Sequence, residues 1–127
     1  MKQSHPAIEQ LRAFFHEMSQ WEISATKVAD ELSIHSERLK KELRALQGKY
    51  CTEKAKMRSF DFSDPPTYWD TVIDEAEETG NSKVSFSTHT KSLNDKYMYI
   101  LIKKGDEWKL SDRFFLDFEG NAMKVSF

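Results

Sequence analysis

Residues 97–110 read YMYILIKKGDEWKL, and this stretch decides the fold of the C-terminal third of the chain. Its first six residues are apolar or aromatic at every position, which is typical of a central strand whose two faces are both covered. Gly105 can take a positive φ, so residues 104–107 predict a tight hairpin turn. After the turn, Trp108 and Leu110 alternate with polar residues, as in a strand with one buried face. The stretch therefore predicts two antiparallel strands joined by a hairpin.

Strands of the same kind flank this hairpin on both sides. On its N-terminal side, apolar residues alternating with serines predict a half-buried strand over 84–88. On its C-terminal side, the same alternation predicts strands over 114–118 and 123–127, with a turn at residues 119–121. Because short strands joined by tight turns form an antiparallel meander, we expect one antiparallel sheet in the last third of the chain.

The N-terminal half predicts helices. Apolar residues recur at spacings of three and four over residues 6–20, which indicates one buried helix face. A second helical region is expected to begin near Ser24 or Thr26, either of which can cap a helix. A break is expected over residues 33–36, and Gly48 is a plausible end of this region.

Two consecutive prolines at 65–66 mark the end of the helical region, because prolines neither continue a helix nor lie in a central strand. Periodicity alone leaves residues 67–78 open between a helix and a strand. We expect one α+β domain over residues 1–127, mainly helical over 1–60 and mainly antiparallel sheet over 67–127. Helices packed into a curved sheet form a cone, which leaves a pocket at its open end unless large side chains fill it.

Composition and charge exclude several classes of protein. Hydrophobic residues make up 39% of the 127 and the net charge is −2, so the chain can bury a core and does not favour nucleic acid. No apolar stretch is long enough to span a bilayer, and residues 1–6 lack a signal-peptide core, so we expect a cytoplasmic protein without membrane contact. Cys51 is the only cysteine, which excludes an intramolecular disulfide and predicts a packed residue in preference to a nucleophile.

No catalytic grouping or metal-ligand cluster is present in the sequence, so we expect no enzyme, no metal and no cofactor. His89 is expected to point away from the cone interior. Asp112 either points inward as a general base, with Arg113 facing away, or lies as a strand-end carboxylate at the rim of the sheet. Lys54, Lys56 and Arg58 could bind phosphate or an acidic partner, but no aromatic residue lies among them, so a solvated basic edge is expected there.

Three segments carry a family resemblance in combination. They are FHEMSQWE at 15–22, KYCTEK at 49–54 followed by Arg58 and the two prolines, and the hairpin of 97–110 with its Gly105-x-x-Trp108 spacing. From about residue 8 to its end the chain resembles the NTF2-fold immunity proteins of bacterial polymorphic toxin systems. The resemblance implies an NTF2-like cone, a strand over 67–78, and a protein that neutralises a cognate toxin by direct stoichiometric binding.

A toxin-binding surface is then expected on the acidic run that follows the prolines, because residues 61–80 contain seven acids and no Lys or Arg. Two solvated faces that partly neutralise each other are the alternative explanation of this charge pattern. Complementary charge speeds encounter, and buried aromatic anchors slow release. The expected toxin-binding residues are Tyr68, Trp69, Asp70, Asp74, Glu75, Glu77 and Glu78.

The same fold also serves small-molecule-binding proteins and enzymes of the isomerase or dehydratase type. The cone interior discriminates between these functions, because a pocket with an inward acid or base would favour an enzyme. A cone filled by Phe14, Phe15, Phe86 and Trp108 would favour a binding protein. A homodimer through the outer sheet face is a further expectation that suits either function.

Overall fold

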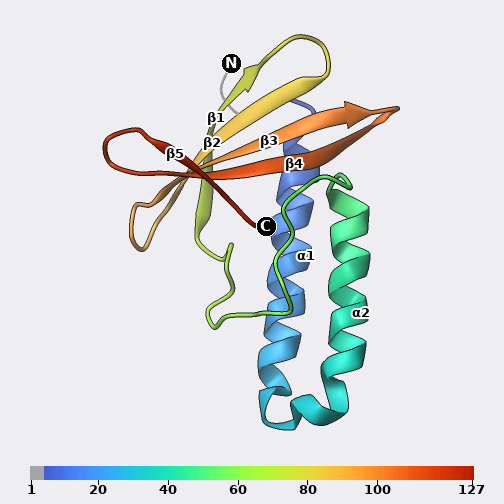
Figure 1. Cartoon of the computed structure of the whole chain (residues 1–127). Coiled ribbons are helices and arrows are strands. Elements are labelled where there is room, and N and C mark those ends of the chain that lie inside the picture. The colour runs from blue at the N-terminus through green and yellow to red at the C-terminus, as the bar shows by residue number, and fades with distance from the viewer. Residues whose placement is uncertain (1–4) are drawn as a thin grey trace.

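The computed structural model describes residues 5–127 and shows two helices followed by a five-stranded antiparallel sheet (Figure 1). The helices are α1 (Ile8–Lys27) and α2 (Leu32–Tyr50), with a short 3-10 helix, η1 (Ala29–Glu31), between them. The strands are β1 (Thr71–Glu78), β2 (Lys83–Thr90), β3 (Lys96–Lys104), β4 (Glu107–Leu116) and β5 (Ala122–Val125). This order confirms the α+β fold class and is that of an NTF2-like fold.

The sheet has the strand order β1-β2-β3-β4-β5 with antiparallel neighbours, and it is not closed. The predicted hairpin is present, and Gly105 in its turn has a φ of 62°. Residues 71–78 form an edge strand, which decides the segment that periodicity left open. The second strand of the hairpin and the strand predicted over 114–118 are one continuous strand, β4, and it ends at Leu116, so that Phe118 is fully exposed. The strand predicted over 123–127 is β5.

The first helix is longer than predicted. It continues past residue 20 to Lys27, and the residues expected to begin a second helix, Ser24 and Thr26, lie inside it. The Ser24 hydroxyl donates to the backbone oxygen of Trp21 at 2.7 Å, so it bonds within the helix and does not cap a new one.

The link between the helices also differs from the prediction. It lies at residues 28–31 and not at 33–36, and α2 passes Gly48 to end at Tyr50. Contacts between the helices favour this arrangement, because the buried Trp21 donates from Nε1 to the backbone oxygen of Leu39 at 3.1 Å. That bond joins the two helices side by side, and no local sequence pattern contains it.

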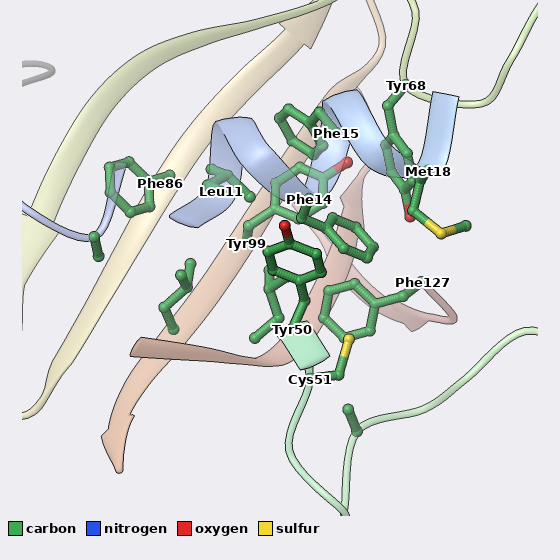
Figure 2. Close-up of a cluster of buried hydrophobic side chains, with 14 of the residues drawn as sticks. Leu11, Phe14, Phe15, Met18, Tyr50, Cys51, Tyr68, Phe86, Tyr99 and Phe127 are labelled. Carbon is green, nitrogen blue, oxygen red and sulfur yellow. The ribbon is translucent and has the colours of Figure 1, made fainter. Parts of the chain in front are cut away.

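Both helices lie on one side of the sheet, which we call its inner face; the opposite side is its outer face (Figure 1). Leu11, Phe14 and Phe15 of α1 lie close to Tyr99 of β3, and Phe127 closes the cluster from the other end of the chain (Figure 2). The inner face therefore carries the hydrophobic core, and no helix within residues 5–127 covers the outer face.

Candidate functional site

The inner face of the sheet is filled by large side chains. Phe14, Phe86 and Tyr99 have no exposed surface, and Phe15 is 9% exposed. The ring centroids of Phe15 and Tyr99 are 5.1 Å apart, in an edge-to-face contact (Figure 2). Trp108 is half-buried near the rim, with its ring centroid 4.9 Å from that of His5. Three of the four residues named as possible fillers, Phe14, Phe15 and Phe86, thus occupy the interior and Trp108 packs beside it, as expected for a binding protein.

A β-bulge in β4 reverses the predicted orientations of Asp112 and Arg113. The pairing of β3 with β4 shifts at this point, with Ser111 as the extra residue. One extra residue exchanges the faces of all that follow it. Asp112 therefore lies on the outer face, with its carboxylate 2.9 Å from Nζ of Lys124. The option that Asp112 points inward as a general base is wrong.

Arg113 takes the inward position instead. Its guanidinium carbon lies 4.3 Å from the ring centroid of Tyr97, and its Nε donates to the Tyr99 hydroxyl at 3.1 Å. Its Nη1 donates to the backbone oxygen of Ser126 at 2.9 Å. Burial alone would lower the pKa of Arg113, but the neighbouring tyrosines outweigh burial and raise the pKa above its ordinary value. Arg113 therefore stays charged and ties β3 and β4 to the C-terminal segment.

Arg58 is not part of a solvated basic edge. Its side chain is 10% exposed, and its Nη1 lies 3.2 Å from the carboxylate of the fully buried Glu22. Its Nε donates to the backbone oxygen of Phe127 at 2.9 Å. The prediction is wrong for Arg58 because its partner lies 36 residues away in the sequence, while Lys54 and Lys56 are exposed as expected.

Cys51 is buried, in agreement with its predicted packing role. Burial raises the pKa of its thiol to about 12, and the nearby Lys109 lowers it only in part. Because the thiolate is the reactive form, we expect no reaction of the folded protein with Ellman's reagent at about pH 8 and full reaction after denaturation. Fast reaction of the folded protein would show that Cys51 is accessible and would contradict this prediction.

Two of the seven predicted toxin-binding residues lie inside the molecule. Tyr68 is 3% exposed and stacks on Phe15 at 5.0 Å, so it is a core residue and not a surface anchor. Asp70 is 6% exposed and accepts hydrogen bonds from the backbone and hydroxyl of Ser92. Burial alone would raise the pKa of Asp70, but the bonds from Ser92 outweigh it and lower the pKa below its ordinary value.

The other five predicted residues reach the surface. Trp69 is 57% exposed and borders a groove of about 390 Å³ between α1 and the start of β1. Glu75 and Glu77 are exposed on the outer face, where their strand partners are Ser87 and Ser85.

The last two acids already have partners. The Asp74 carboxylate lies 2.9 Å from Nδ1 of His89, which points outward as predicted. Glu78 is exposed and lies 3.4 Å from Nε2 of His5.

The outer face has an apolar centre that the predicted site did not include. Met98, Ile100 and Ile102 of β3 and Phe114 of β4 are half-buried there, opposite the buried Tyr99 and Leu101. The acids of β1 lie at one edge of this centre. The unbroken apolar run at 97–102 was the signal for it, because only a two-faced strand needs apolar residues at every position.

Residues 5–127 contain no group of His, Cys, Asp and Glu side chains that could hold a metal ion. Within the same part of the chain, neither helix combines the length and apolarity needed to cross a membrane.

A family model described as NTF2 fold immunity protein matches residues 7–125, nearly the whole chain. The chain belongs to the NTF2 fold immunity protein family. No curated protein and no solved structure matches the chain. Membership of this family agrees with the helix–sheet order and with the segments that carried the resemblance, and it points to a protein partner for the exposed surface.

Proposed function

We propose that this protein neutralises a cognate bacterial toxin by direct stoichiometric binding in the cytoplasm. The family match over residues 7–125 carries the proposal. The filled inner face supports binding over catalysis, because large side chains occupy the space that a substrate would need. No specific observation favours the small-molecule or isomerase alternative.

We place part of the toxin contact at the exposed acids of β1 and at Trp69. Glu75 and Glu77 project from the outer face of an edge strand and form a negative surface that would attract a basic toxin, and Glu78 lies at the end of the same strand on the opposite face, beside His5. Trp69 offers a large, half-exposed ring next to a groove, which is typical of an interface anchor.

Charge reversal on β1 tests this surface. We expect Glu75→Lys, Glu77→Lys and Glu78→Lys together to slow toxin association roughly tenfold at low salt and much less at high salt, because screening weakens steering. Stopped-flow or biosensor kinetics would measure the rates. The matched control is Asp30→Lys, Glu31→Lys and Glu37→Lys, which makes the same charge change at exposed residues around η1. Equal association rates for the two triple variants would remove the β1 acids from the toxin contact.

Neutralisation itself is tested with a candidate toxin domain encoded beside this protein. We expect the two chains to purify as a one-to-one complex, and co-expression to restore growth that the toxin alone arrests. A chain that restores growth at substoichiometric levels without forming a complex would favour a catalytic role.

A homodimer through the outer face stays a prediction. The half-buried Met98, Ile100, Ile102 and Phe114 give it an apolar centre. Sedimentation equilibrium of the wild-type protein and of Ile100→Lys would measure it, and an identical monomer mass for both would exclude a dimer through this face.

A further inference from the structure

A second groove, of about 850 Å³, lies where the end of α2 meets the outer face near the β3–β4 hairpin. Five lysines line the groove, one from the segment after α2 and one each from β2, β3, β4 and β5. They are Lys54, Lys83, Lys104, Lys109 and Lys124. Glu53 and Asp112 are the acids among its lining residues. The groove is therefore net positive although the whole chain is net negative.

Strand pairing builds the floor of this groove. Lys83 pairs with Ile102, and Ile102 pairs with Lys109, so the three residues form one row across β2, β3 and β4. Directly opposed residues have Cβ atoms about 5 Å apart, which places the two ammonium groups on either side of the half-buried isoleucine. Lys104 follows two positions after Ile102 and shares its face.

Two of the five lysines have a hydrogen-bond or ion-pair partner within the molecule. Nζ of Lys109 donates to the backbone oxygen of Lys49 at 2.7 Å, and Lys124 pairs with Asp112. Lys54, Lys83 and Lys104 form no ion pair with any residue in the part of the chain that the structure describes. Grouping three such charges around an apolar floor is unfavourable for the free protein, and a negatively charged partner would relieve it.

We propose that this groove receives a carboxylate-rich segment of the partner protein, with the Ile102 floor contacting an apolar side chain of that segment. The proposal rests on the proposed function, because the partner is the toxin. A protein segment fits better than nucleic acid, since the groove has no aromatic side chain for base stacking. Glu77 of β1 pairs with Ser85 of β2 and so lies on the same face as Lys83, beside the β2 end of the groove. The toxin would then present acidic residues here and basic residues at β1.

Lys83→Glu with Lys104→Glu tests the proposal against the toxin domain. We expect toxin affinity to fall roughly tenfold or more at low salt. The control, Lys27→Glu with Lys41→Glu, makes the same charge change at exposed helix positions and is expected to alter affinity less than about twofold. If the toxin binds wild type and the groove variant equally, the groove proposal is wrong and the proposed function stands.

A second experiment tests the groove without the toxin. We expect an octaglutamate peptide at low salt to shift the backbone NMR signals of the groove residues, and this binding to disappear in the Lys83→Glu, Lys104→Glu variant while the control keeps it. Absence of peptide binding to wild type would overturn the groove proposal, even where the toxin binds. If the toxin fails to bind wild type, the proposed function fails and the peptide result alone decides the groove.

Two further outcomes would contradict the choice of occupant. Tighter binding of a short DNA duplex than of the peptide would assign the groove to nucleic acid. A wild-type dimer that the groove variant converts to a monomer would assign it to the acidic edge of a second copy. Far-UV circular dichroism and urea midpoints of both variants check that the exposed lysines were replaced without loss of fold.

Discussion

Replacement of Glu22 by glutamine is expected to reduce the free energy of unfolding by about 3–5 kcal/mol, the usual cost of breaking a buried ion pair by removing one partner. Glu22 has no exposed surface, and its two carboxylate oxygens accept four hydrogen bonds. One oxygen accepts from Arg58 and the Thr67 backbone, and the other from the backbone and hydroxyl of Ser63. The amide nitrogen of glutamine would face two of these donors and leave the Arg58 charge unpaired.

Urea unfolding followed by far-UV circular dichroism measures this loss. The control is Glu17→Gln, which removes an exposed carboxylate 3.1 Å from Nζ of Lys49 and is expected to cost less than about 1 kcal/mol. Because small domains are stable by about 5–15 kcal/mol, the Glu22 variant would keep only part of its stability. Equal midpoints for the two variants would mean that Glu22 does not hold the segment 58–67 onto α1.

Phe14→Ala is expected to cost about 3–5 kcal/mol, because it removes a buried ring and leaves a cavity that the neighbours cannot fill. Phe14 has no exposed surface, and its ring centroid lies 5.3 Å from that of Tyr68, 5.8 Å from that of Tyr50 and 5.9 Å from that of Phe127. These partners come from the loop before β1, the end of α2 and the end of the chain. The loss therefore weakens the contacts of α1 with α2 and with the two segments that flank the sheet.

Phe118→Ala is the matched control, because it removes the same ring from a fully exposed position and is expected to change stability by less than about 0.5 kcal/mol. Thermal or urea unfolding of both variants checks the pair. A Phe14 variant as stable as the Phe118 variant would show that the inner face can collapse around the missing ring, and it would reopen the question of a cavity there.

Much of the fold could be predicted from the sequence because it depends on local patterns. Strand periodicity and turn geometry can be read directly from the sequence here. The signals are the unbroken apolar run at 97–102, the turn glycine at 105 and the alternation of apolar and polar residues in the neighbouring strands. The spacing of Phe14 and Phe15 in the first helix likewise predicted a buried helix face, but it left open whether the cone is filled or holds a pocket. Helix ends were predicted less well, since the bond between Trp21 and Leu39 joins two helices and has no local signal.

Which side chains lie on the outer face of the sheet depended on the tertiary structure. Strand period predicted the orientation of His89, but one extra residue at Ser111 exchanged the faces of Asp112 and Arg113, which no alternation rule detects without the register.

What the sequence by itself determined about this protein is therefore its α+β order, its meander and its apolar interior, because period, turn residues and apolar spacing act within a few neighbouring residues. Only the tertiary structure decided which charges are buried and which are presented. The pairing of Glu22 with Arg58 and the row of Lys83, Ile102 and Lys109 bring together residues far apart in the chain. Electrostatic energy depends on distance and burial in space, and the linear order of residues contains neither.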